Sequence, residues 1–144
     1  MILLKQLYEI VIVPVAVKDE LFKIQSKRKD VENLFLNDWI QIREIRDIQF
    51  YNELKMNLDE GESQAIVLAK ELNADIILID ETKGRREATR AGLNVIGLIG
   101  ILIDAKAHHI IAKVKPLLDE LIEQYGVWIK PELYSAVLTS INEN

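Results

Sequence analysis

Two short aliphatic blocks, Ile10–Val13 and Ile76–Ile79, constrain the fold of this chain most strongly. Neither block alternates with polar residues, which predicts strands that are buried on both faces of a parallel sheet. A longer run follows the first block, and the spacing of Val17, Leu21 and Ile24 predicts a helix over about 15–27 with one apolar stripe. This alternation is typical of an α/β fold with helices on the faces of a parallel sheet.

The rest of the chain continues the same alternation. Asn73 and Gly92 are natural helix stops before the strands that follow them, and Pro131 is suited to open a last helix. No linker-like or repeated segment interrupts the pattern, so we expect one domain over residues 1–144. The further expected elements are a strand over 39–45, helices over 60–72 and 83–91, a strand at 95–96, and helices over 98–108, 114–124 and from 131 toward 140.

Composition excludes several classes of protein. There is no cysteine, which excludes thiol nucleophiles and disulfide scaffolds, and the adjacent His108 and His109 lack the spacing of a helical metal site. The longest uncharged stretch has 13 residues, Ala91–Ile103, which is shorter than the ~20 that a membrane-spanning helix needs. Lys5 interrupts the first apolar run, so no secretory signal is predicted. We therefore expect a cytoplasmic protein without a membrane partner.

The net charge of −5 argues against a protein that coats nucleic acid through its overall charge. The acidic excess lies entirely after Asn57, yet cationic residues also cluster in that part of the chain. The cluster comprises Lys83, Arg85, Arg86 and Arg90. Any nucleic acid contact is therefore expected to be local.

Three carboxylates fall where a buried face would disfavour them. Glu20 borders the stripe of the first helix, Glu62 flanks the apolar face of the helix over 60–72, and Asp80 follows the second aliphatic block. Each also has a structural interpretation: Glu20 can reach water, Glu62 can complete a capping box with Asp59, and Asp80 can cap the next helix. The carboxyl ends of parallel strands are nevertheless where such sheets bind ligands. Acids there, beside Lys83, Arg85 and Arg86, are typical of a metal-dependent phosphodiesterase.

Several segments together resemble a PIN-like family of predicted nucleic acid-binding proteins, and the resemblance covers essentially the whole chain. The N-terminal part carries Ile12-Val13-Pro14 with Val17 and Glu20. The other segments are Leu58–Glu62 with Ala65-Ile66, Ile79–Glu81 with Lys83–Arg86, Gly97–Gly100 with Ala105-Lys106, Pro116–Leu121, and Leu133-Tyr134.

The resemblance implies a three-layer α/β/α sandwich with a parallel sheet. It also implies Mg²⁺ or Mn²⁺ held by Glu20, Glu62 and Asp80 for cleavage of single-stranded RNA, with Lys83, Arg85 and Arg86 on the RNA phosphates. Many relatives are toxins of toxin–antitoxin pairs, so an antitoxin protein is an expected partner, and a homodimer is expected as well.

The chain departs from the family at its start. The usual first strand, which carries an aspartate and occupies the middle of the sheet, is not matched, and residues 1–8 resemble the end of the helix that follows it. The resemblance therefore implies a nuclease weakened by the loss of one carboxylate. The alternative is a catalytically inactive PIN-like subunit that binds a protein partner. A receiver-type phosphoacceptor would rest on Asp80 alone.

Overall fold

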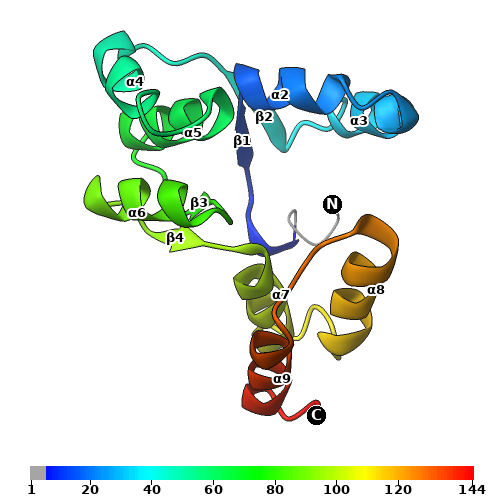
Figure 1. The fold of residues 1–144 in the computed structure, drawn as a ribbon. Coiled ribbons are helices and arrows are strands. Elements are labelled where there is room, and N and C mark those ends of the chain that lie inside the picture. The colour runs from blue at the N-terminus through cyan, green and yellow to red at the C-terminus, as the bar shows by residue number, and fades with distance from the viewer. Residues whose placement is uncertain (1–5) are drawn as a thin grey trace. The chain divides into compact units, whose positions relative to one another are not determined.

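The two aliphatic blocks lie in two separate parallel strand pairs (Figure 1). The computed structural model describes residues 6–144, so the first five positions of the expected helix end lie outside it. Strand β1 (Val11–Pro14) pairs with β2 (Ile40–Arg43), and β3 (Ile77–Leu78) pairs with β4 (Val95–Ile96). The parallel direction predicted from the sequence is confirmed in both pairs.

Most of the predicted helices are confirmed, with small shifts at their ends. The predicted helix over 15–27 is too long, because the chain leaves the helical conformation at Ile24 before a short 3-10 turn, Gln25–Lys27. The helices α3 (Arg28–Leu34) and α4 (Ile48–Leu54) were not predicted. The others are α2 (Val15–Phe22), α5 (Glu60–Glu71), α6 (Thr82–Arg90), α7 (Leu98–Ala107), α8 (Lys115–Tyr125) and α9 (Pro131–Ser140).

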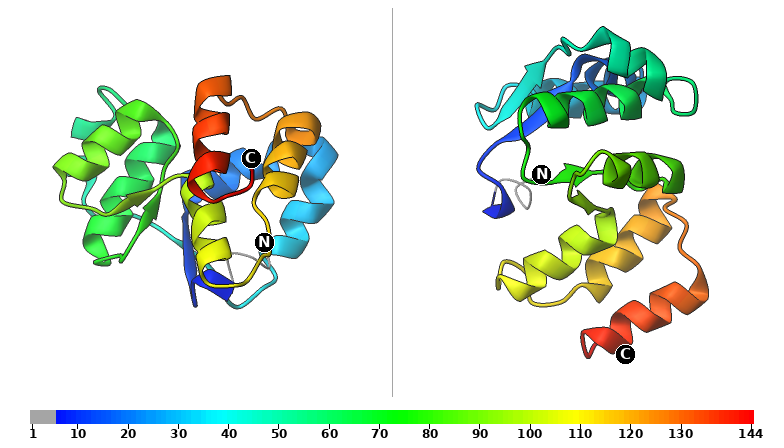
Figure 2. Two further views of the ribbon diagram at one scale, coloured as in Figure 1. Left: turned by 90° about the horizontal axis from the view of Figure 1, so that it is seen from below. Right: turned by 90° about the vertical axis from the view of Figure 1, so that its left-hand side faces the viewer.

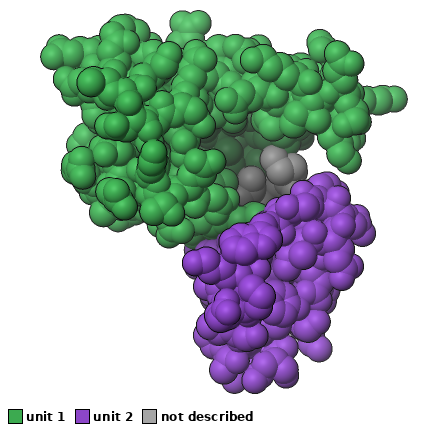
Figure 3. All heavy atoms as spheres, in the orientation of Figure 1, with its two compact units in different colours: residues 1–98 green, residues 99–144 purple. Residues whose placement is uncertain are grey.

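The chain forms two compact units, residues 1–98 and residues 99–144 (Figure 3). In the first unit, α5 contacts both β1 and β3. The buried apolar cluster around α5 comprises Leu54, Leu58, Ile66, Val67, Ala69, Ile77, Ile79 and Ala88. The central position of this helix matters for function, because its first turn carries one of the predicted site residues.

Burial on both strand faces was predicted for the two aliphatic blocks, and this prediction is wrong for half of the second block and for all of the first, where Val11 and Val13 are only half-buried. Ile77 and Ile79 are buried, whereas Ile12 and Leu78 are 37% and 48% exposed. Ile10 and Ile76 are exposed as well. Successive side chains of a strand point to opposite faces, so the exposed residues share the face of each strand that is less covered, while the other face is covered better.

Asn73 and Gly92 both adopt left-handed backbone conformations, with φ of 49° and 85°. Each follows a helix and precedes a strand, which confirms the predicted helix stops.

The carboxylate of Glu71, at the end of α5, fixes the connection between β2 and α4. Its Oε1 atom accepts hydrogen bonds from the backbone amides of Arg46 and Asp47, each at 2.7 Å. Asp47 in turn accepts from the amide of Phe50 and caps α4. A side chain on the central helix thus holds a segment that has no regular structure of its own.

The second unit packs parts of three helices on one another. Figure 2 shows α7, α8 and α9 from two further sides. The buried residues of this unit, on the helices and at the N-cap of α8, are Ile101, Leu102, Ala105, Val114, Leu118, Val137 and Leu138.

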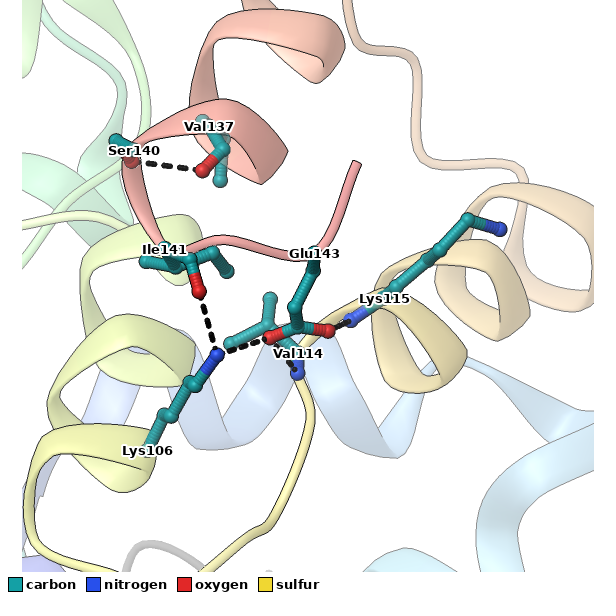
Figure 4. Close-up of polar contacts among 7 residues, drawn as sticks. All are labelled: Lys106, Val114, Lys115, Val137, Ser140, Ile141 and Glu143. Carbon is teal, nitrogen blue, oxygen red and sulfur yellow. Dashed lines mark hydrogen bonds and ion pairs between the residues drawn. The ribbon is translucent and has the colours of Figure 1, made fainter.

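Glu143 ties the end of this unit to its other helices (Figure 4). Its carboxylate accepts from the backbone amides of Val114 and Lys115 at 2.8 and 2.9 Å and pairs with the Lys106 ammonium at 2.9 Å. Burial alone would raise the pKa of Glu143, but these three donors outweigh it and lower the pKa to about 2. The side chain is only 4% exposed, so the carboxylate is a buried and fully engaged anion.

Candidate functional site

The site starts from the first turn of α5, where a capping box of Asp59 and Glu62 was the structural alternative to a metal site. Half of that alternative is confirmed: Asp59 caps the helix by accepting from the Glu62 amide at 2.8 Å. The Glu62 side chain does something else. Its Oε2 atom is buried and has no hydrogen-bond partner among the described residues. The carboxylate is therefore aimed into the protein without being satisfied there.

Gly84 on α6 makes room for the Glu62 carboxylate. A Cβ at position 84 would collide with Glu62 Oε2 and would lie 2.9 Å from Ile79 Cγ2. Glycine inside a helix costs roughly 1 kcal/mol relative to alanine, so its presence here has a spatial reason. This role of Gly84 was not predicted from the sequence, although a lone glycine within a helical pattern was the available signal.

The pKa of Glu62 is raised from 4.5 to about 7, mainly because the side chain is shielded from water. The nearby carboxylates of Asp59 and Glu81 add to the effect, and Glu20 contributes less. Like charges that gather around a poorly hydrated acid disfavour its ionised form. The first turn of α5 is therefore a place of uncompensated negative potential.

Glu20 lies next to this turn, and it is exposed rather than held against a buried face. A Cβ at Gly61 would lie 3.4 Å from Val17 Cγ2, 3.6 Å from Glu20 Oε2 and 3.7 Å from Asp59 Oδ1. Helix α2 therefore approaches α5 so closely that the Glu20 and Asp59 carboxylates both lie next to Gly61.

Asp80 caps a helix, but not the one expected from sequence. Its Oδ1 atom accepts from the backbone amide of Leu98, the first residue of α7, at 2.9 Å. Helix α6 instead begins after Glu81, which makes no side-chain capping bond. A Cβ at Gly97 would lie 2.9 Å from Asp80 Oδ1 and 3.3 Å from Arg85 Nη1. The Asp80 carboxylate and the Arg85 guanidinium therefore both lie next to Gly97.

The acids that act on Glu62 overlap with the predicted trio only in part. Glu20 is among them, whereas Asp80 is not, and Asp59 and Glu81 come in addition. Within residues 6–144, no three histidine or acidic side chains stand in an arrangement that could hold a metal ion. The signal for Glu81 was its position directly after Asp80 at the end of a strand, and the signal for Asp59 was the capping box itself.

The predicted phosphate-binding residues lie together on α6. Lys83, Arg85 and Arg86 are all exposed. Arg90, farther along the same helix, pairs with Glu87 at 3.1 Å. The start of α6 therefore presents cations near the acids of α5 and near Asp80. Such cations can bind the negatively charged oxygens of a phosphodiester.

No helix in the described part of the chain is both long and apolar enough to cross a lipid bilayer.

Comparison with known proteins identifies the fold family. A family model described as a PIN domain matches residues 1–143. No curated protein and no solved structure matches the chain. The mixed α/β architecture with parallel strand pairs agrees with that fold, and the family supports a nuclease-type function in general, with nucleic acid as partner and a divalent metal as the usual cofactor. The chain therefore belongs to the PIN domain family.

Proposed function

We propose that this chain is a metal-dependent endoribonuclease that cuts single-stranded RNA. Glu20, Glu62 and Asp80 are assigned as the carboxylates for Mg²⁺ or Mn²⁺. One observation carries the proposal: the buried Oε2 atom of Glu62, which has no partner among the described residues and is surrounded by further acids.

The chemical type of these donors suits a hard divalent cation. Carboxylate oxygens are the ligands that Mg²⁺ and Mn²⁺ prefer, and among the described residues no cation is a cause of the shifted Glu62 pKa. When bound, such an ion polarises a phosphoryl oxygen and lowers the pKa of a water. Glu62 and Glu20 would hold it from α5 and α2.

Asp80 contributes through an oriented carboxylate. The hydrogen bond from Leu98 uses Oδ1 only and fixes the direction of the second oxygen. Arg85 lies beside this carboxylate, and Lys83 and Arg86 share its helix. These three cations would bind the RNA backbone on either side of the scissile phosphate and keep it near the acids.

We propose that cleavage by the 144-residue chain is weak. The described acids do not form a trio with metal-binding geometry, so their arrangement must change before they can share one ion. Misplacement by about 1 Å can lower a catalytic rate on the order of 100-fold. A toxin role, with an antitoxin protein as partner, fits a nuclease of this family.

Self-association is part of the proposal. The second unit exposes Trp128 and Leu133, at 76% and 47% exposure, which is apolar surface that a homodimer could cover. Light scattering at micromolar concentration should give twice the monomer mass of 16.5 kDa.

The experiment is cleavage of a fluorescent single-stranded RNA with Mn²⁺, Mg²⁺ or EDTA. Weak cleavage is expected with either metal, none with EDTA, and loss of cleavage in Glu62→Gln and Asp80→Asn. Glu53→Gln, which changes an exposed acid on α4, is the control and should cut like the unmodified chain. Cleavage that persists in both site variants would overturn the assignment. If no form cuts RNA but a protein partner binds, the chain is an inactive interaction subunit instead.

A further inference from the structure

The junction of α2 and α3, in the first unit, carries an aromatic pair at the surface. The Phe22 ring at the end of α2 stacks on the Phe35 ring just after α3, with the ring centroids 5.7 Å apart and the planes inclined by 23°. Both residues are only half-buried. Aromatic rings that keep part of their surface in water are available for contact with a ligand.

Two cations lie over the Phe22 ring. Lys18 Nζ is 5.7 Å and Arg28 Cζ is 5.6 Å from the ring centroid. The electron-rich face of the ring attracts each cation, but two positive charges gathered at one ring repel each other. An anion beside the two cations would be attracted by both and would reduce the effect of their repulsion.

Acids of the chain neutralise these two cations only weakly. Among residues 6–144, the Lys18 ammonium is in no ion pair. Arg28 pairs with Glu32 through Nε at 3.2 Å, but the two side chains are 58% and 53% exposed. An exposed pair of this kind contributes little, so another anion can replace it. Both cations can therefore bind a ligand.

The turn after α2 adds more positive charge. Residues 23–29 include four cations and no acid, and all these positions are exposed. Arg28 and Lys29 share the first turn of α3 with one acid, Asp30, although the helix dipole disfavours cations there. Their charge therefore does not stabilise that helix. We call the patch the α2–α3 surface, and it comprises Lys18, Phe22, Lys23, Arg28, Lys29 and Phe35.

Cations interleaved with aromatic rings suit single-stranded RNA. Lysine and arginine bind its phosphates whatever the sequence, and its unpaired bases stack on aromatic rings and on guanidinium planes. An acidic peptide would use the cations of the α2–α3 surface but would have no groups that stack on its rings. The combination therefore favours RNA over an acidic protein as the ligand.

Helix α2 connects the α2–α3 surface to the candidate acids. It contacts both α5 and α3, and Figure 1 shows it between them. Glu20 lies on α2 next to Gly61 of α5. Lys23 follows three residues later with helical backbone angles, and residues three apart lie on the same side of a helix. A strand that runs along α2 would thus pass from the α2–α3 surface over Lys23 to Glu20.

We propose that the α2–α3 surface is an exosite for single-stranded RNA, which holds the strand a few nucleotides away from the scissile phosphate. Lys18 and Arg28 bind phosphates there, and bases pack against the exposed parts of Phe22 and Phe35. The role in cleavage rests on the proposed nuclease, but RNA binding at this surface does not. The test therefore measures binding under conditions in which no cleavage occurs.

The test is fluorescence anisotropy of a labelled oligouridine with the full chain, in EDTA and over a range of salt concentrations. The double variant Lys18→Gln/Arg28→Gln should bind about tenfold more weakly or worse. It should also reduce the slope of log affinity against log salt by about 1.4, because each phosphate contact on a single strand contributes about 0.7. If this variant fails to fold, Lys23→Gln/Lys29→Gln serves in its place.

The matched control is Lys55→Gln/Lys70→Gln, which removes the same charge from two exposed positions outside the α2–α3 surface. Lys55 also lies over an aromatic ring, that of Tyr51, at 5.4 Å from its centroid. This control should bind RNA like the unmodified chain. Phe35→Leu keeps an apolar side chain but removes a ring, and it should weaken RNA binding about fivefold or more.

Three results would overturn the proposal. The first is equal RNA affinity of Lys18→Gln/Arg28→Gln and the matched control. The second is tight binding of polyglutamate that Lys18→Gln/Arg28→Gln weakens, with no effect of Phe35→Leu on RNA, which would assign the surface to an acidic protein. The third is the absence of RNA binding at low salt.

Failure of the exosite and failure of the nuclease give different results. If RNA binding is lost in Lys18→Gln/Arg28→Gln but no form of the chain cuts RNA, the exosite is supported and the nuclease is wrong. If the chain cuts RNA and this variant binds and cuts like the unmodified chain, the nuclease is supported and the exosite is wrong.

Discussion

Asp80 Oδ1 and the backbone amide of Leu98 are joined by a 2.9 Å hydrogen bond that connects the end of a strand to the start of a helix. The residue that sequence analysis assigned to metal binding therefore also has a structural role. Because a carboxylate and an amide oxygen can both accept this bond, the two roles can be separated by substitution.

Asp80→Asn should keep the capping bond and remove the charge. Its stability should stay close to that of the unmodified chain, while Asp80→Ala loses the cap and should lower the free energy of unfolding by about 1 kcal/mol. Urea unfolding followed by circular dichroism measures both. Equal destabilisation by the two variants would mean that the charge, and not the cap, matters for folding.

Gly84→Ala should destabilise the first unit. The added methyl group meets the Glu62 carboxylate and Ile79 Cγ2, and overpacking of this kind costs about 1–3 kcal/mol. Thermal unfolding checks this, with Thr89→Ala at an exposed position of the same helix as the control.

When Glu62→Ala is already present, Gly84→Ala should lower the free energy of unfolding less, because Glu62→Ala removes one of the two groups that the new methyl group would meet. The double variant should therefore lose less free energy of unfolding than the sum of the losses of the two single variants. Strict additivity would show that the glycine and the carboxylate do not press on each other.

Glu62→Gln should stabilise the chain at pH 8 in the absence of divalent metal. The folded pKa of about 7 lies above the unfolded value near 4.5, so the folded state binds more protons and stability falls as pH rises through this window. The amide cannot ionise, and the variant should lose this dependence. Urea midpoints between pH 4 and pH 8 give the measurement, and parallel curves for the two proteins would contradict it.

Glu143 should give the opposite dependence in the second unit. Its folded pKa of about 2 lies below the unfolded 4.5, so its contribution is complete above the unfolded value and is lost as pH falls toward 2. Glu143→Gln should weaken the bonds to Val114, Lys115 and Lys106, by about 1.5–3 kcal/mol for a charged acceptor, and should flatten the acid side of the profile. Tryptophan fluorescence of Trp128 between pH 2 and pH 6 follows this unit in a Trp39→Phe background, which removes the tryptophan of the first unit, and an unchanged profile would rule out the predicted role.

Much of this fold follows from local patterns. The stripe of α5, the left-handed Asn73 and Gly92, and the cap at Asp59 are encoded within a few residues, and the sequence was sufficient to predict them. The exposure of Ile12 and Leu78 was not predictable in this way, because it depends on what covers the second face of each strand, which no local pattern records.

The candidate site residues were chosen from the sequence by type and position, which says little about how their side chains are grouped. The acids and cations at element ends could be read from their positions, but Asp80 bonding to Leu98 joins residues 18 positions apart. The close approach of Gly84 to Glu62 depends on the packing of α6 on α5, which becomes visible only once both helices are placed.

The hydrogen bonds that the Glu71 carboxylate accepts from the backbone amides of Arg46 and Asp47 affect how fast a protease can cut the chain. Trypsin cuts after arginine, and it needs several residues around the bond to adopt an extended form in its cleft. Arg43 and Arg46 lie on either side of Glu44 and Ile45, in the short link between β2 and α4, and would be ready targets if that link were loose. Because a carboxylate of the central helix holds two consecutive amides there, cutting requires local opening around the end of α5. The lifetime of this link under digestion therefore reports on the stability of α5.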